Sequence, residues 1–332
     1  MKTIFKGKNG ATGLSFMLVG SMVGAGFITG SEIWHFFARF NGGLAFGCVV
    51  LFLLIYYLVY SELNKKFNDD YVLISRQKQA REQVNYISEL LIASAMISGL
   101  KNIISTLFNF DNLIIFLGVI LVIFIILFFG FRLFSLYNYF IIGFIVFVVG
   151  AILVNFNVEN TDAVFNLSVI NSVKSSVYAI LYVFMNISAI RPIIREFAPN
   201  FSKNKAKFSA LFFAILMLNL ILIISIFLIK NTSYSRESMP LLKLFGENGK
   251  VLKTIFCVGV IFSMVSTCVG CLFGVKSKII HKTGDNLFSS IVCVLMALIL
   301  GNFSFDFFVS VVYPVIGFLN FLIFIFDILK KL

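Results

Sequence analysis

Charged residues are scarce in this sequence. Only 13% of the 332 residues are Asp, Glu, Lys or Arg, whereas 60% are hydrophobic and the mean hydropathy is +1.00. An average soluble domain carries about a quarter charged residues. A chain with so few charges cannot cover itself with a water-solvated surface. The composition therefore excludes a soluble enzyme or a secreted domain and predicts an integral membrane protein.

Histidine, proline and linker-like stretches are also rare. The two histidines, His35 and His281, lie near opposite faces of the membrane, which argues against zinc or histidine-based catalysis. Four prolines and no Ser/Gly-rich run leave no linker, so residues 1–332 are expected to form one transmembrane domain. No phosphate-binding Gly-Lys-Ser/Thr motif is present. We therefore expect neither an enzyme nor an ATP-driven pump, and no cofactor.

Cysteine is used sparingly and without a clear pattern. All five cysteines fall within apolar stretches, where small buried packing residues are expected rather than disulfides or metal ligands. They are Cys48, Cys257, Cys268, Cys271 and Cys293.

Long apolar stretches are abundant. A bilayer core about 30 Å thick requires roughly 20 helical residues. Ten stretches satisfy this length approximately, and the first is interpreted as a membrane helix rather than a cleaved signal. They cover residues 11–38, 43–64, 84–109, 112–130, 136–156, 172–197, 207–230, 251–275, 286–302 and 305–329.

The positive charges are distributed unevenly between the two sides of these predicted spans. If the N-terminus is inside, 19 of the 27 Lys and Arg residues lie on the inner side, 7 lie on the outer side and Lys101 lies within the third span. Cytoplasmic loops carry such an excess, so both termini are predicted to be cytoplasmic. Cationic loops beside anionic lipid also account for the net charge of +12 without any nucleic-acid partner.

The ten spans divide into two similar halves, at about 11–156 and 172–329. Each half has a long first helix marked by glycine or asparagine, a tight turn, a second helix and then a polar loop. Because five is an odd number, the second half must be inverted in the membrane relative to the first. Inverted repeats whose first helices are discontinuous are typical of secondary transporters, which bind substrate at the membrane midplane.

The first span contains glycine at positions 20, 24, 26 and 30. Glycine weakens a helix by about 1 kcal/mol relative to alanine. An interruption here would free backbone carbonyls for a cation and backbone amides for an anionic group. The alternative is close helix packing, because Gly20/Gly24 and Gly26/Gly30 each fit small-xxx-small contacts. Gly24 and Gly26 cannot share one packing face, which favours the interruption.

A resemblance to a known family lies in the same segment. The run from Gly20 to Ile33, GSMVGAGFITGSEI, is followed by Phe36-Phe37 and Asn41-Gly42-Gly43. It resembles the first helix of YkvI-type bacterial membrane proteins in the amino acid-polyamine-organocation superfamily. This resemblance implies the leucine-transporter fold, with broken helices 1 and 6, in a bacterial cytoplasmic membrane.

The resemblance also implies a sodium site. In sodium-coupled members, carbonyls of the first helix and hydroxyls of the eighth hold the ion, and Gly20 and Val23 are the matching carbonyl positions. The eighth span contains Ser263, Ser266 and Thr267, whose spacing is similar to the family's motif. A hard cation prefers such oxygen ligands. Packing between helices explains serine and threonine equally well, and proton-coupled members lack the site.

The sixth span is where the second interruption is expected. Asn186 marks it, and a buried amide needs a partner such as a substrate, an ion, a freed backbone group or a neighbouring helix. Pro192 could instead place the interruption nearer the cytoplasmic end. Together with Ser21, Gly24 and Gly26, Asn186 forms the expected substrate site.

Ionisable residues within spans are functional candidates. Glu32 lies six residues after Gly26, a rise of about 9 Å along a helix, toward the outer side. It could form a rim cluster with His35 and Arg39, or act as a gate or proton-coupling carboxylate. Lys101 in the third span could extend outward or pair with a carboxylate such as Glu32, and Glu89 in the same span has no assigned role.

The sequence thus favours a sodium- or proton-coupled secondary transporter of a small organic solute. The resemblance to the superfamily implies that this solute is similar to an amino acid. The alternative is a receptor that uses the same fold to sense a ligand without moving it.

Overall fold

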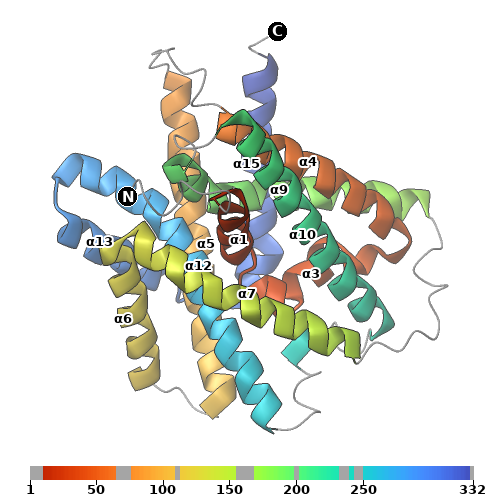
Figure 1. Ribbon diagram of the computed structural model, residues 1–332, viewed down its shortest axis with the longest axis horizontal. Coiled ribbons are helices and arrows are strands. Elements are labelled where there is room, and N and C mark those ends of the chain that lie inside the picture. Colours follow the sequence, from red (N-terminus) through yellow and green to blue (C-terminus); the bar gives the residue numbers. More distant parts are fainter. Residues whose placement is uncertain are drawn as a thin grey trace.

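The computed structural model describes residues 10–64, 76–108, 113–154, 168–197, 202–231, 239–242 and 250–329, and these residues are helical with short connections (Figure 1). Seven of the helices are long and apolar enough to cross a membrane. Three shorter apolar helices, Ala11–Met22, Leu113–Phe129 and Asn286–Leu300, lie at the remaining predicted spans. The chain is therefore a multi-pass, all-helical membrane protein.

The helices follow the predicted apolar stretches closely. The first segment comprises α1 (Gly10–Met22), α2 (Ala25–Ile28), α3 (Ser31–Phe36) and a 3₁₀ turn, η1 (Ala38–Gly43). The others are α4 (Leu44–Asn64), α5 (Arg76–Phe108), α6 (Leu113–Phe129), α7 (Phe131–Val154), α9 (Val169–Phe197), α10 (Lys203–Lys230), α12 (Lys250–Thr283), α13 (Asn286–Leu300), α14 (Phe305–Phe307), the π-helix η5 (Phe308–Val312) and α15 (Tyr313–Leu329).

The first apolar segment is not one continuous helix. Helix α1 ends at Met22, Val23 and Gly24 are not helical, and α2 begins at Ala25. A second change of direction occurs at Gly30, whose φ of 85° lies in the left-handed region that glycine adopts without strain. The carbonyl of Thr29 accepts a hydrogen bond from Leu241 N at 2.8 Å, so residues 239–242 hold this turn from outside.

Two predictions about helices are wrong. Helix α9 runs without interruption from Val169 to Phe197, so the expected break at Asn186 is not present. It contains no glycine, and Pro192 removes only one backbone donor from the helix. The predicted extents of two further helices are also too short: α12 extends eight residues beyond the predicted end at 275, and α5 begins eight residues before the predicted start at 84. Lys276 and Arg81 therefore belong to helices rather than to loops.

The long helices pack as two groups around α1, which lies near the centre of the view in Figure 1. Helix α4 packs on α9 and α10, and α10 also packs on α1. Helix α5 packs on α12 and α13, and α6 also packs on α12 and α13. Helix α15 contacts both α9 and α5, and α1 contacts α7, α9, α10 and α12. The interrupted segment therefore lies between the two groups.

Candidate functional site

The non-helical residues between α1 and α2 face α12. Ser263 Oγ donates a hydrogen bond to the carbonyl of Val23, which lies outside the regular helical pattern. A Cβ added to Gly24 would lie 3.1 Å from Thr267 Oγ1 and 3.1 Å from Met96 Sδ. Thr267 Oγ1 is buried and has no hydrogen-bond partner among the described residues. The structure therefore brings Val23, Gly24, Ser263 and Thr267 together.

An amide on α7 completes this group. Asn138 Oδ1 accepts a hydrogen bond from Ser266 Oγ at 2.8 Å, and its Nδ2 donates to Phe134 O at 3.0 Å. The same Oδ1 fills the space beside Gly20, where an added Cβ would overlap it. The first segment thus meets polar side chains at two places. Val23 and Gly24 contact Ser263 and Thr267, and Gly20 lies against Asn138, which accepts a hydrogen bond from Ser266.

Glu32 lies against the interrupted segment rather than farther along it. A Cβ on Gly26 would be 2.5 Å from Glu32 Cγ and Oε1, because the turn at Gly30 folds α3 back toward α2. The predicted 9 Å rise assumed a continuous helix and is wrong for this reason. Glu32 is buried, and its carboxylate fills the space in front of Gly26 where an anionic ligand group was expected.

Two tyrosines adjoin Glu32. The Tyr182 hydroxyl from α9 faces both the Glu32 carboxylate and the Asn186 amide, and Tyr313 from α15 lies near Glu32 and Tyr182. Both tyrosine hydroxyls are buried and lack a partner of hydrogen-bonding geometry among the described residues. Tyr313 directly follows the π-helix η5, a distortion that is frequent at functional sites.

Asn186 and Ser21 have partners within their own helices. Asn186 Nδ2 donates to Tyr182 O at 3.0 Å, and Ser21 Oγ donates to Met17 O at 2.8 Å. Asn186 nevertheless adjoins the Tyr182 hydroxyl, whereas Ser21 Oγ faces Gly270 of α12. The structure places Asn186 in the Glu32–tyrosine cluster and Ser21 at the side facing α12.

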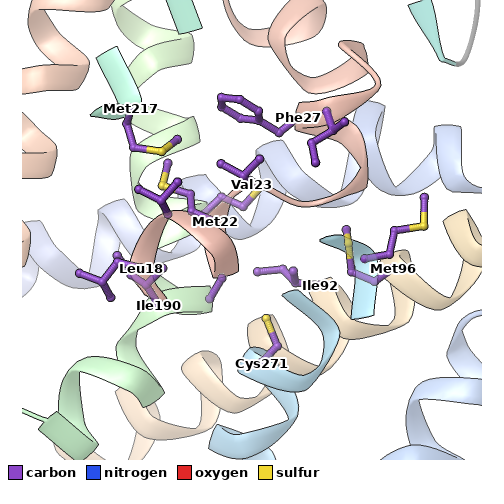
Figure 2. Close-up of a cluster of buried hydrophobic side chains, with 14 of the residues drawn as sticks. Leu18, Met22, Val23, Phe27, Ile92, Met96, Ile190, Met217 and Cys271 are labelled. Atoms are coloured by element: carbon purple, nitrogen blue, oxygen red, sulfur yellow. The ribbon is translucent and has the colours of Figure 1, made fainter. Parts of the chain in front are cut away.

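The surroundings of these polar groups are apolar. Figure 2 shows Leu18, Met22, Val23 and Phe27 of the first segment gathered with side chains of neighbouring helices. Those neighbours are Ile92 and Met96 of α5, Ile190 of α9, Met217 of α10 and Cys271 of α12. In such a setting an unpartnered hydroxyl is costly, and any polar ligand that satisfies it is held strongly.

The other charged candidates lie elsewhere. Lys101 Nζ donates to Asn302 Oδ1 at 2.6 Å, so its partner is an amide and not Glu32. His35 Nδ1 lies 3.0 Å from Ser31 O, and the Arg39 guanidinium lies over the rings of Phe40 and Tyr178. The expected rim cluster around Glu32 is therefore replaced by separate contacts.

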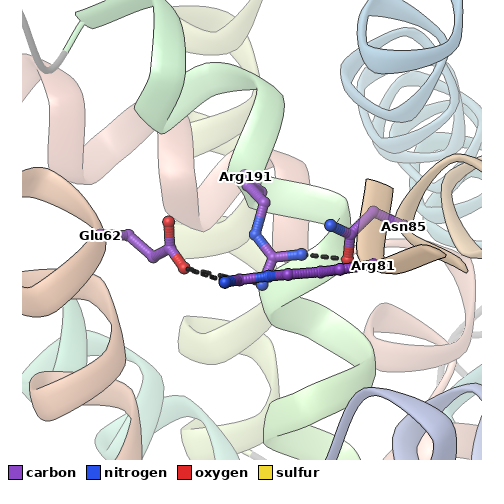
Figure 3. A network of polar contacts seen from close by, with 4 residues as sticks. All are labelled: Glu62, Arg81, Asn85 and Arg191. Atoms are coloured by element: carbon purple, nitrogen blue, oxygen red, sulfur yellow. Dashed lines mark hydrogen bonds and ion pairs between the residues drawn. The ribbon is translucent and has the colours of Figure 1, made fainter. Parts of the chain in front are cut away.

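A polar network joins the two helix groups at the end predicted to be cytoplasmic (Figure 3). Glu62 Oε1 of α4 lies 3.4 Å from Arg81 Nη2 of α5 and 3.7 Å from Arg191 Nη2 of α9. Arg191 also donates to Asn85 Oδ1 of α5. These four residues, which we call the inner network, connect α4 and α9 to α5.

Sequence reasoning missed Asn138, Tyr182, Tyr313 and the inner network. Tyrosines and asparagines in apolar helices carry no mark of function by themselves, since their role depends on which helices adjoin. The period of the apolar residues could have indicated that Asn138 faces inward, but not that it meets Gly20.

Comparisons with known proteins identify the fold. No protein-family model matches the chain, and no curated protein matches it in sequence. Among solved structures, the chain is similar to Mhp1, a nucleobase-cation-symport-1 family transporter in a closed conformation with bromovinylhydantoin bound. The TM-score is 0.58 at 14% identity, over 90% of this chain and 74% of that chain. The chain therefore shares the leucine-transporter fold, while its place in the YkvI-type family stays a prediction.

Proposed function

We propose that this chain is a secondary transporter that moves a small organic solute across a membrane together with a cation. The observation that carries the proposal is the set of buried hydroxyls of Thr267, Tyr182 and Tyr313 around the interrupted first segment, which have no partner of hydrogen-bonding geometry in the part of the chain that the structure describes. A folded protein keeps such groups at a cost of about 1–3 kcal/mol each unless a ligand satisfies them. Their position between two helix groups of a transporter fold supports a carrier.

The proposed substrate site is formed by Glu32, Tyr182, Asn186 and Tyr313, with Gly24 and Gly26 beside it. Because the protein's own carboxylate already lies in front of Gly26, the substrate would present a hydrogen-bond donor to Glu32. Two hydroxyls and an amide can each donate or accept, which suits a compact solute with both kinds of group. Amino acids and ring compounds such as the hydantoin bound to Mhp1 both have this chemistry.

The proposed sodium site uses the carbonyls of Gly20 and Val23 and the hydroxyls of Ser263, Ser266 and Thr267. Asn138 would supply a further oxygen, because its Oδ1 already adjoins Gly20 and Ser266. All these ligands are neutral oxygens, the type that a hard cation accepts. Sodium would fix the interrupted segment to α12 and so couple its own binding to closure around the substrate.

Transport would proceed by movement of α1, α4, α9 and α10 relative to α5, α12 and the helices packed on them. The inner network would close the cytoplasmic side, and the two repeats, about 11–156 and 172–329, would be related by inversion. Alternating access of this kind needs the site to lie where the moving parts meet, as the interrupted segment does.

The first experiment is a thermal-stability screen of the purified protein. Amino acids, nucleobases and hydantoins would be compared in sodium and in potassium at equal ionic strength. A bound ligand raises stability by mass action, by about 2.7 kcal/mol at a hundred times its dissociation constant. We expect sodium to raise the melting temperature more than potassium does, and a solute to raise it further in sodium.

Uptake of that solute into proteoliposomes then separates a carrier from a receptor. Accumulation driven by an inward sodium or proton gradient is expected. Stabilisation without accumulation under either gradient would reject transport and support the ligand-sensing alternative.

A further inference from the structure

A second buried carboxylate lies outside the proposed substrate and sodium sites. Glu89 of α5 has 0% of its surface exposed, and both carboxyl oxygens lack a hydrogen-bond partner among the described residues. Its side chain occupies the space in front of Gly274 of α12, where an added Cβ would overlap Oε2. That added Cβ would also lie 2.8 Å from Pro192 Cγ of α9. Glu89 is thus enclosed where α5, α9 and α12 meet.

The charged and titratable groups that face Glu89 are mostly cationic. They come from every helix packed there and comprise Arg191 and Arg195 of α9, Lys278 and Cys271 of α12, and Tyr86 of α5 itself. Two of these cations have other contacts: Arg191 contacts Glu62 and Asn85, and Lys278 Nζ lies 4.3 Å from the centre of the Tyr86 ring.

The positive side chains around Glu89 limit which cation its carboxylate can bind. A metal ion or an organic amine would enter among three positive side chains and find one carboxylate, which is unfavourable. An unpaired buried carboxylate without donors is also unfavourable. A proton resolves both problems, because a neutral carboxylic acid needs no counter-ion.

We propose that Glu89 is the proton-binding group of this carrier, protonated while the inner network is closed and ionised when the network opens. The inference rests on the proposed function and adds a coupling ion to it. Buried ionisable residues in membrane helices commonly serve proton transfer.

Arg191 provides the switch between the two states. Its terminal nitrogens are held by Glu62 and Asn85, while its Nε is buried and has no hydrogen-bond partner among the residues that the structure describes. When α4 and α9 move away from α5, Arg191 parts from Asn85 and Glu62 parts from Arg81, and water reaches Glu89. The O–H bond of the Glu89 carboxyl group then breaks, the proton passes to water on the cytoplasmic side, and the carboxylate is stabilised by water and by Lys278 of α12, which stays with α5. Closure reverses these steps.

Cysteine labelling tests this without knowledge of the substrate. Cys271 lies one turn before Gly274 and is fully buried, so its reaction with N-ethylmaleimide reports opening of this region. The background variant would have Cys48, Cys257, Cys268 and Cys293 replaced by alanine. Dividing each rate by that of the denatured protein corrects for the pH dependence of an exposed thiol.

We expect the normalised rate to rise with pH, by at most about tenfold per pH unit for one coupled proton. Glu89→Gln should abolish this rise and keep the rate low, because a permanently neutral side chain favours closure. Glu82→Gln, on the same helix, is the matched control and should retain the rise. A Glu89→Gln variant with an unchanged pH profile would overturn the proposal.

Infrared spectroscopy of the purified protein gives an independent readout. The difference between wild type and Glu89→Gln at neutral pH should contain the band of a protonated carboxylic acid, and carboxylate bands alone would overturn the proposal. If Glu89→Gln does not fold, Glu89→Asp replaces it and should shift the midpoint of the labelling profile, whereas an unmoved midpoint rejects Glu89. Neither readout requires uptake, so a failed transport assay rejects the carrier while leaving the proton site to be judged separately.

Discussion

At the scale of single residues, the fit of Gly20 against Asn138 shows how closely the proposed sodium site is built. Asn138 Oδ1 occupies the position that any larger residue at 20 would need, and it also accepts the Ser266 hydroxyl. The glycine is therefore required by the neighbouring helix α7 and not by its own backbone, which lies within helix α1. Asn138 in turn is fixed by Phe134 O at 3.0 Å.

Gly20→Ala is expected to destabilise the protein by about 1–3 kcal/mol, because Asn138 must leave its place. Asn138→Ala should cost about 1–3 kcal/mol by leaving the Ser266 hydroxyl unpaired. In the double variant the two costs should not add, since the new methyl group would meet only the Cβ of residue 138, at 3.7 Å. Melting temperatures of the four proteins in one detergent measure this, and strictly additive losses would contradict the contact.

At the scale of helices, the first segment is interrupted whereas α9 is continuous, although the sequence predicts an interruption in both. The first segment contains four glycines between positions 20 and 30 and departs from helical geometry at Val23, Gly24 and Gly30. Helix α9 has no glycine, and Asn186 satisfies its amide on the preceding turn through Tyr182 O. A buried amide is thus accommodated by an intact helix, whereas a group of glycines with a facing hydroxyl is not.

Thr267→Val is expected to abolish the stabilisation of the protein by sodium relative to potassium. The substitution keeps the shape of the side chain and removes the hydroxyl proposed as a sodium ligand. In potassium the variant should be as stable as the wild type or slightly more so, because a buried hydroxyl without a partner is removed.

Ser290→Ala on α13 is the matched control for this comparison. Its hydroxyl is buried but bonds to Asn286 O at 2.8 Å within its own helix, so the sodium effect should persist. Equal sodium effects in wild type and Thr267→Val would remove Thr267 from the ion site.

At the scale of the whole molecule, the inner network joins two groups of helices that otherwise make most of their contacts within themselves. Glu62 on α4 bridges to Arg81 on α5, and Arg191 on α9 reaches Asn85 on α5. Removing one partner from such a partly buried arrangement weakens the compensation of the remaining charges. The network should therefore set how often the cytoplasmic end opens.

Glu62→Gln is expected to favour the open state by about 1 kcal/mol, which corresponds to roughly a fivefold faster labelling of Cys271. Asp306→Asn at the exposed start of α14 removes a carboxylate outside the network and should leave the rate unchanged. A Glu62→Gln rate equal to that of the parent protein would show that the network does not control opening.

Sequence alone determined the membrane class, the positions of the apolar helices and the glycine-rich segment, because these depend on local composition and on the length needed to cross a bilayer. It also singled out Gly20, Val23, Ser263, Ser266 and Thr267, although their role as ligands stays a prediction. Only the tertiary structure decided that Glu32 folds back on Gly26, that α9 is continuous, that Tyr182 and Tyr313 lie near Glu32, and that Asn138 lies against Gly20. Those outcomes depend on which distant helices meet, and the period of a single helix carries no information about its partners.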